Sequence, residues 1–250
     1  MWPYPKIVAH RGGGSLAPEN TLAAMQCGLD YGFRAVEFDV MLSKDGVPVL
    51  MHDPDFGRTV IGIGSVATTL AQDLMQMDAG SWFDARFAQV RVPSYEAVFL
   101  FCQTHQIWMN VEIKPAPGFE KETGRVVASL TQELLKTLDL TTAPPLFSSF
   151  SFDALLAAKQ VAPEIARGYL LDDFEPDWLH ALQTLDAVAL HTNQKNLTPA
   201  WVKEIKAAGY GLFCYTVNTP ERGREIMSWG VDGFCTDRID LITANFAEHV

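Results

Sequence analysis

Three acidic residues alternate with apolar residues in two segments that have the composition of buried strands. Glu37 and Asp39 lie in the first segment, and Glu112 lies in the second. A carboxylate on such a strand is costly to bury unless a metal ion or a basic group compensates its charge. Three carboxylates without a nearby cysteine suit a hard divalent cation such as Mg²⁺ or Ca²⁺. The alternative is a buried ion-pair network with Arg11 and Lys114.

Two histidines, His10 and His52, stand at the ends of candidate strands. Imidazole is the side chain that both accepts and donates protons near neutral pH. Beside the carboxylates, one histidine would accept a proton and the other would donate one, and chain position leaves the assignment of acid and base open. The remaining histidines are interpreted as structural, although His191, which ends a candidate strand, could line the pocket.

The first apolar run leads directly into His10, Arg11 and three glycines at positions 12–14. Glycines let the backbone approach a ligand closely, and an arginine can bind a phosphate through two parallel hydrogen bonds. On its own, this segment would be interpreted as a structural turn with a solvated arginine. Together with the carboxylates, it favours a phosphate contact by Arg11.

Apolar runs of strand length alternate with segments of helical periodicity along the chain. Strands are expected near residues 7–10, 35–40, 109–114, 146–150, 167–171, 187–191, 211–217 and 232–236. Helices are expected near residues 20–31, 94–105, 152–160 and 199–208. This alternation predicts an α/β fold, a TIM-type (β/α)8 barrel, in which catalytic residues stand at the carboxyl ends of the strands.

One strand-like segment, residues 47–53, follows its predecessor too closely for a helical crossover. A β-hairpin fits this spacing, because Asp45-Gly46 is a strong signal for a two-residue type I′ turn. That turn would place Asp39 opposite His52, so that both side chains converge on the same site. The alternative is a ninth, irregular strand of the barrel.

A segment at about residues 54–92 follows the hairpin and is too long for an ordinary barrel loop. It contains glycines and aromatic residues, including Trp82 and Phe83. We expect a small insertion that lies over the catalytic face. The alternative is a surface excursion without contact to the substrate.

The composition fits a single catalytic barrel domain over residues 1–250, with a hydrophobic content of 48%. A formal net charge of −11 argues against nucleic acid or an anionic membrane as a partner. It still allows a small anionic substrate. The start of the chain lacks a secretory pattern, no apolar run approaches the length of a spanning helix, and the four cysteines are scattered. The expected location is the cytoplasm, without stable membrane association.

Several short motifs then follow one another along nearly the whole chain. They are His10-Arg11-Gly12, Pro18-Glu19-Asn20-Thr21, Glu37-Phe38-Asp39-Val40, Lys44-Asp45-Gly46, His52-Asp53-Pro54, Glu112-Ile113-Lys114, Ser148-Ser149-Phe150, Tyr215-Thr216-Val217-Asn218, Gly230-Val231-Asp232-Gly233 and Thr236-Asp237. In this order they make the chain resemble the glycerophosphodiester phosphodiesterase family, with the greatest likeness to its cytoplasmic bacterial members.

The resemblance implies a divalent metal, Mg²⁺ or Ca²⁺, on the three carboxylates and acid–base catalysis by His10 and His52. Arg11 and Lys114 match the family's phosphate and substrate contacts. The further candidates for the lining of the pocket are Glu19, Ser149, Phe150, Tyr215 and Asn218. Tyr215 departs from the family pattern, because many members carry tryptophan there, and this bears on the shape of the glycerol pocket.

The implied activity is hydrolysis of glycerophosphodiesters, which are deacylated phospholipids, to sn-glycerol 3-phosphate and an alcohol. The glycerol 2-hydroxyl would attack phosphorus to give a cyclic phosphate, or water would attack directly. One alternative is a lysophospholipase D-type enzyme, favoured if Trp82, Phe83 and Phe87 rim an apolar groove. Another is a non-catalytic phosphate-binding barrel, which would leave the carboxylates and both histidines without a role.

Overall fold

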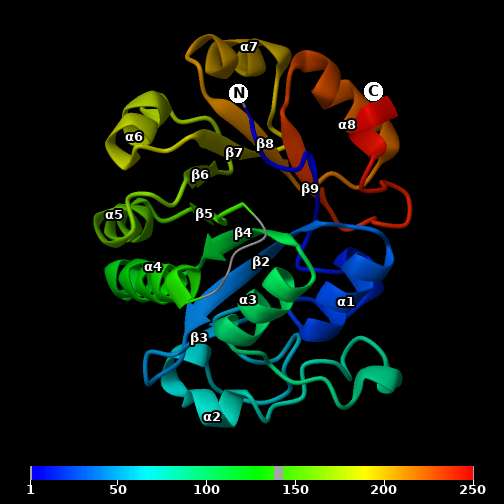
Figure 1. The fold of residues 1–250 in the computed structure, drawn as a ribbon, viewed down its shortest axis with the longest axis vertical. Helices are drawn as coiled ribbons and strands as arrows, with labels where there is room; N and C mark the ends of the chain where they lie inside the picture. The colour runs from blue at the N-terminus through cyan, green and yellow to red at the C-terminus, as the bar shows by residue number, and fades with distance from the viewer. Residues whose placement is uncertain (1, 138–142, 250) are drawn as a thin grey trace.

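The computed structural model describes residues 2–137 and 143–249, whose strands form a closed parallel barrel (Figure 1). The strands of the ring are β1 (Ile7–Ala9), β2 (Ala35–Leu42), β4 (Trp108–Ile113), β5 (Leu146–Ser149), β6 (Arg167–Leu171), β7 (Ala189–Asn193), β8 (Gly211–Tyr215) and β9 (Gly233–Thr236). Each strand pairs with the next in this order, and β9 pairs with β1 to close the ring. The predicted α/β barrel and its eight strands are confirmed.

Helices connect successive strands on the outside of the ring (Figure 1). They are α1 (Leu22–Asp30), α3 (Tyr95–Thr104), α4 (Glu120–Thr137), α5 (Phe152–Val161), α6 (Trp178–Leu185), α7 (Pro199–Ala207) and α8 (Pro220–Trp229). Five of them begin after a serine or threonine whose hydroxyl accepts a hydrogen bond from the first turn: Thr21, Ser94, Ser151, Thr198 and Thr219. Within the described residues, none of the helices has the length and apolar character needed to span a membrane.

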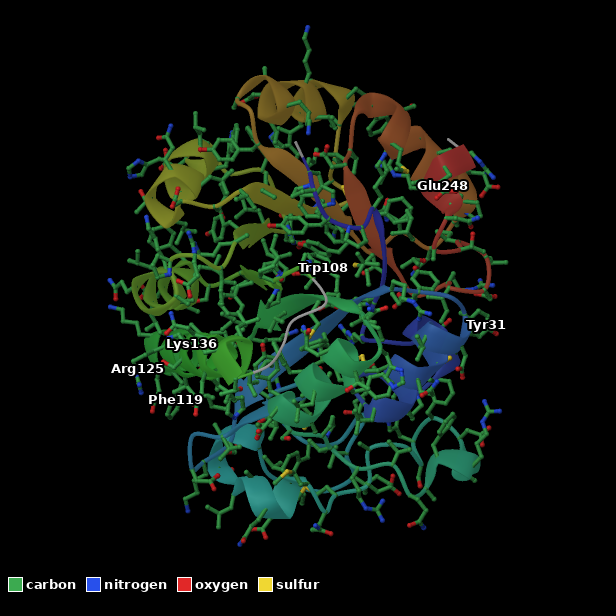
Figure 2. The ribbon with its side chains drawn as sticks, viewed as in Figure 1. Tyr31, Trp108, Phe119, Arg125, Lys136 and Glu248 are labelled. Carbon is green, nitrogen blue, oxygen red and sulfur yellow. The ribbon has the colours of Figure 1, made fainter. Side chains whose placement is uncertain are left out.

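Most strand positions are apolar on both sides, as is typical of buried parallel strands, and the polar residues of β2 and β4 are exceptions. One large cluster of buried side chains fills the space between strands and helices. A smaller cluster fills the barrel itself, where Tyr4 stacks on Trp108 and Trp2 stacks on Phe213. In Figure 2, Trp108 lies among the strands at the centre, whereas Arg125 and Lys136 project outward from α4. The N-terminal segment therefore contributes aromatic side chains to the barrel interior.

A short antiparallel strand, β3 (Pro48–Leu50), lies outside the ring and pairs with the end of β2. Val40 is the partner of Leu50, and β2 pairs on its other edge with β4. The prediction of an extra hairpin is confirmed, and the segment is not a ninth strand of the barrel.

The predicted register of this hairpin is wrong by one residue, so Asp39 does not pair with His52. The backbone N–H of Ser43 donates to the Val47 carbonyl, which leaves a loop of three residues instead of two. The last of them, Gly46, has φ +76°. A left-handed residue after a type I turn is a common geometry for a three-residue hairpin loop. His52 consequently reaches the site from the segment that follows β3.

The insertion predicted at about residues 54–92 lies within the segment 51–94 between β3 and α3, at the bottom of Figure 1 beside β3. Its short helical turns are η2 (Val66–Thr68), α2 (Ala71–Leu74) and η3 (Ala85–Phe87). Its apolar side chains pack with two residues of the hairpin in a cluster of their own, which contains Met41, Val49, Met51, Val60, Val66, Leu74, Ala79 and Val92. The insertion is thus attached to the barrel through the hairpin.

Replacing Gly124 with alanine is expected to destabilise the fold, although alanine is the better helix former. A Cβ at this position of α4 would overlap the carbonyl oxygen of Ala154 in α5. Helix propensity favours alanine by about 1 kcal/mol, whereas overpacking costs about 1–3 kcal/mol. We expect a net loss in the free energy of unfolding, measured by urea denaturation. The exposed Ser129→Ala in the same helix should not destabilise, and a Gly124→Ala protein as stable as the parent would contradict this packing.

Candidate active site

Three carboxylate side chains from two neighbouring strands converge at the carboxyl end of the barrel. Glu37 and Asp39 belong to β2 and Glu112 belongs to β4, and the strand register places Asp39 beside Glu112. One carboxylate oxygen from each residue lies within 4.8 Å of the others. Oxygen donors gathered in this way match the preference of Mg²⁺ and Ca²⁺.

Basic side chains of the protein balance the charge of Asp39. Lys114 Nζ lies 3.3 Å from its Oδ1, and Arg11 Nε lies 3.5 Å from its Oδ2. Asn20 Nδ2 donates a hydrogen bond of 2.8 Å to the same carboxylate. Burial acts to raise the pKa of Asp39, but Lys114 and Arg11 outweigh it and hold this pKa at about 2. Asp39 is therefore ionised at neutral pH.

The other two carboxyl groups are less well compensated. Burial raises the pKa of Glu37 to about 7, with His10 acting against it and Asp39 adding to it. Burial and the charge of Asp39 also raise the pKa of Glu112 well above its ordinary value. The ion-pair network of the alternative interpretation is thus centred on Asp39. A divalent cation would supply the positive charge that Glu37 and Glu112 lack, so this donor set fits a metal.

His10 is held by a carboxylate from the other end of the chain. Its Nδ1 lies 2.6 Å from Asp237 Oδ1, and its Nε2 lies 3.7 Å from Glu37 Oε2. Burial acts to lower the pKa of His10, but the hydrogen bond to Asp237 and the charge of Glu37 raise it above its ordinary value. Asn218 Nδ2 donates to the second oxygen of Asp237 at 2.9 Å. Two residues from the last part of the barrel thus fix this imidazole.

His52 is also held by a carboxylate at Nδ1, but its pKa is shifted in the opposite direction to that of His10. Its Nδ1 lies 2.7 Å from Asp53 Oδ1, and Arg58 Nε donates to the other oxygen of Asp53 at 2.6 Å. Burial lowers the pKa of His52, and the opposing charge of Asp39 does not offset this effect. In both histidines a carboxylate on Nδ1 leaves Nε2 for other partners, and the two pKa values move in opposite directions.

The loop after β1 brings Arg11 into the site. Arg11 has φ +50° and Gly12 has φ +91°, a tight turn in which a Cβ on Gly12 would lie 2.8 Å from Met25 Sδ. Arg11 Nη1 donates to Glu19 Oε1 at 2.8 Å. Arg58 of the insertion donates to both oxygens of Glu19 at 2.7 Å. One carboxylate thus joins the first loop to the insertion.

These groups surround a pocket of about 170 Å³, which we call the central pocket. It is lined by His10, Arg11, Glu37, His52, Asn110, Glu112, Lys114, Ser148, Phe150, Leu170, His191, Phe213, Tyr215, Thr216 and Cys235. A wider pocket of about 760 Å³, the second pocket, shares His10 and Arg11 with it. Its other lining residues are Gly14, Ser15, Ala17, Glu19, Trp82, Phe83, Asn218, Thr219, Asp237 and Arg238.

The residues that were expected to line one pocket lie in different pockets of the structure. Phe150 and Tyr215 line the central pocket and pack edge to face at 5.6 Å. Glu19 and Asn218 line the second pocket. Ser149 is not among the lining residues of the central pocket; its hydroxyl donates to the Ile113 carbonyl at 2.5 Å, and it borders a side pocket next to Phe150. The neighbouring Ser148 lines the central pocket instead.

Several groups of this site are absent from the candidates chosen from the sequence. Asp237 and Asp53 hold the two imidazoles, and Asn20 and Arg58 hold the carboxylates of Asp39 and Glu19. Asn20, Asp53 and Asp237 belong to the family motifs quoted above, and this membership could have marked them as candidates. Arg58 has no such signal, because its role depends on how the insertion folds.

Known proteins resemble this chain in sequence and in fold. The Glycerophosphoryl diester phosphodiesterase family matches residues 10–241. A glycerophosphodiester phosphodiesterase of Caldanaerobacter subterraneus subsp. tengcongensis is 31% identical over 235 residues, which cover 92% of this chain and 93% of the relative.

Two solved structures share the fold over nearly their whole length. The structure of an Oleispira antarctica phosphodiesterase in complex with the product sn-glycerol-3-phosphate has a TM-score of 0.85 and 38% identity, with 93% of each chain covered. The crystal structure of a glycerophosphodiester phosphodiesterase from Agrobacterium tumefaciens has a TM-score of 0.79 and 27% identity, with 99% of this chain and 100% of the other covered. This chain therefore belongs to the glycerophosphoryl diester phosphodiesterase family.

Proposed function

We propose that this protein hydrolyses water-soluble glycerophosphodiesters to sn-glycerol 3-phosphate and an alcohol with the help of a divalent cation, Mg²⁺ or Ca²⁺. The observation that carries the proposal is the gathering of three carboxylates at one point, where two of them, Glu37 and Glu112, line the central pocket together with two imidazoles and two basic side chains. The product complex of the Oleispira antarctica phosphodiesterase supports the same product class. The substrate is a small molecule, and the free, mostly buried cysteines support a cytoplasmic location.

Glu37, Asp39 and Glu112 would hold the cation, which would supply positive charge to the phosphoryl oxygens. Arg11 and Lys114 would bind the phosphodiester anion from the protein side, because both line the central pocket beside the carboxylates. A guanidinium and an ammonium are the two side-chain groups that proteins use for this purpose.

His10 and His52 would move the protons of the reaction. One imidazole removes the proton of the glycerol 2-hydroxyl, whose oxygen then attacks phosphorus. The bond from phosphorus to the alcohol oxygen breaks, and the other imidazole protonates that oxygen. Water opens the resulting cyclic phosphate with the roles reversed. Asp237 and Asp53 would orient the rings through Nδ1. Direct attack by water is the competing route.

We also propose that the barrel and the inserted segment 54–92 act as one catalytic domain over residues 1–250. Arg58 of the insertion bonds to Asp53, which holds His52, and to Glu19, which holds Arg11. A structural change in the insertion would therefore affect the positions of both His52 and Arg11.

A lysophospholipase D-type activity is the second candidate, because aromatic side chains border the second pocket. Trp82 and Phe83 line it, and Phe83 packs edge to face on Phe87 at 5.7 Å. Charged groups such as Glu19 and Arg238 line the same pocket, which favours a polar alcohol over an acyl chain. A panel of glycerophosphodiesters and lysophospholipids, run with Mg²⁺, Ca²⁺, Mn²⁺ and chelator, separates the two candidates.

The activity itself is tested with glycerophosphocholine and a phosphatase that releases phosphate from the product monoester. We expect phosphate release that depends on added metal and stops with chelator. A non-catalytic phosphate-binding barrel would release none under any of these conditions.

His10→Ala and His52→Ala are each expected to lower turnover at least about a hundredfold, the lower end of what acid–base catalysis contributes. The measurement is kcat for glycerophosphocholine at saturating metal. His180→Ala, on the exposed side of α6, is the matched control and should keep full turnover. Near-normal turnover in either of the first two variants would reject the role assigned to that residue.

Glu112→Gln is expected to weaken metal binding at least about tenfold, since even indirect changes around metal ligands cost that much. Because the folded state raises the pKa of Glu112, its ionised form opposes folding at neutral pH, and metal-free Glu112→Gln should unfold at a higher temperature than the parent. Metal titrations followed by calorimetry and thermal unfolding check both results. The exposed Glu122→Gln is the control, and an unchanged metal affinity in Glu112→Gln would count against ligation by this residue.

A substrate without the glycerol 2-hydroxyl is expected to lose at least about a hundredfold in rate, because the cyclic route uses that oxygen as the nucleophile. Hydrolysis of 2-deoxyglycerophosphocholine and of glycerophosphocholine would be compared under identical metal conditions. An undiminished rate, with solvent oxygen incorporated into the phosphate, would remove the cyclic route in favour of direct hydrolysis.

A further inference from the structure

The deep end of the central pocket contains polar atoms that the proposed chemistry does not use. Asn110 and His191 are 2% and 1% exposed, and both line this pocket. Within the described chain, the Oδ1 atom of Asn110 and both ring nitrogens of His191 are buried without a hydrogen-bond partner. Buried polar atoms of this kind are rare in folded proteins and call for a specific explanation.

The strand register shows that these atoms lie below the catalytic groups. Asn110 is the partner of Glu37 on β2 and precedes Glu112 by two residues on the same face of β4. Two residues along a strand correspond to about 6.6 Å, so Asn110 lies one layer deeper in the barrel than Glu112. His191 enters the same space from β7, and the ring of Phe213 packs against it at 4.9 Å.

The surroundings of His191 favour the neutral form of its imidazole. Burial lowers its pKa to about 3, so at neutral pH the imidazole has one donor and one acceptor nitrogen. Its place depends on Gly168 of β6, because a Cβ there would overlap His191 Nε2. On the other side, the ring of Trp2 lies 6.2 Å from the imidazole. The part of the chain that the structure describes thus makes room for an imidazole but supplies no hydrogen-bond partner for it.

The two pockets differ in volume, and this difference suggests which part of a phosphodiester each of them binds. The central pocket, with about 170 Å³, has room for roughly five water molecules at about 30 Å³ each, which suits a small polyol group. The second pocket is wider, opens from the same His10 and Arg11, and is bordered by aromatic and charged side chains. It suits an alcohol of variable size.

We propose that Asn110 and His191 bind the terminal hydroxyl of the glycerol group. The glycerol half of the substrate then points into the barrel, and the departing alcohol lies toward the second pocket. A hydroxyl both donates and accepts hydrogen bonds, so it can pair with the Asn110 oxygen and with a nitrogen of His191. This inference rests on the proposed glycerophosphodiesterase function, and it makes Asn110 and His191 the residues that select glycerol over shorter diols.

The test compares glycerophosphocholine with 2-hydroxyethyl phosphocholine, which keeps the hydroxyl next to the phosphoester carbon and lacks the terminal hydroxymethyl group. Choline release gives kcat/KM for both substrates. The parent protein should prefer glycerophosphocholine by at least about tenfold, the effect of one hydrogen bond. In His191→Phe and in Asn110→Leu this ratio should fall toward one. A ratio near one in the parent, or an unchanged ratio in both variants, would overturn the proposal.

Thr192→Val is the matched control. The hydroxyl of Thr192 is also buried without a partner in the described chain, but this neighbour of His191 does not line the central pocket. Each variant that removes one of these unpartnered groups should unfold at the same temperature as the parent or at a higher one. The substrate ratio should fall only in the variants of the pocket, so a fall of the same size in Thr192→Val would contradict a specific contact.

A binding measurement keeps this proposal separate from the catalytic one. Calorimetric titration with sn-glycerol 3-phosphate and with 2-hydroxyethyl phosphate requires no turnover. The parent should bind the first more tightly by at least about tenfold, and either variant should lose this difference. This result would support the hydroxyl contact even if His10 or His52 failed its own test. Equal binding of the two monoesters by the parent would refute the contact even if both histidines proved catalytic.

Discussion

Repulsion among three carboxylates, two of them buried and one partly buried, is the constraint around which the site is arranged. The parallel pairing of β2 with β4 brings Glu37, Asp39 and Glu112 together, and the burial of the strands supplies the free energy that holds them there. Lys114 and Arg11 neutralise Asp39 and lower its pKa, whereas the pKa values of the two glutamates are raised. The charges of Glu37 and Glu112 are therefore less well compensated than that of Asp39, which is the electrostatic basis for the proposed binding of a divalent cation.

Several groups around this point are held by partners from distant parts of the chain. His10 at the end of β1 meets Asp237 after β9 because these two strands close the barrel. His52 is held by Asp53, and Arg58 links that carboxylate to the first loop. The orientation of His10 thus depends on barrel closure, whereas His52 is held by the next residue in the chain, whose carboxylate is fixed in turn by Arg58 of the insertion.

The sequence was sufficient to predict the barrel and the acidic cluster, because buried parallel strands are mostly apolar and a carboxylate on them is conspicuous. The sequence was insufficient where a shift of one residue changes the register of a strand pair or the side of a strand that faces the pocket. The loop that ends with Gly46 has three residues instead of two, and Ser148 lines the central pocket in place of Ser149. The contact between His10 and Asp237 could not be derived from spacing either, since they approach each other only through ring closure. The motifs drew attention to both residues without giving their contact.

The central claim is that one cation occupies the position defined by the three carboxylates, and anomalous scattering from crystals grown with Mn²⁺ tests it most directly. The account predicts a single strong peak within about 2.6 Å of an oxygen of each of Glu37, Asp39 and Glu112, a distance typical of divalent cations. A peak elsewhere in the barrel, or no peak at all while the three carboxylates keep only protein groups as partners, would contradict the account.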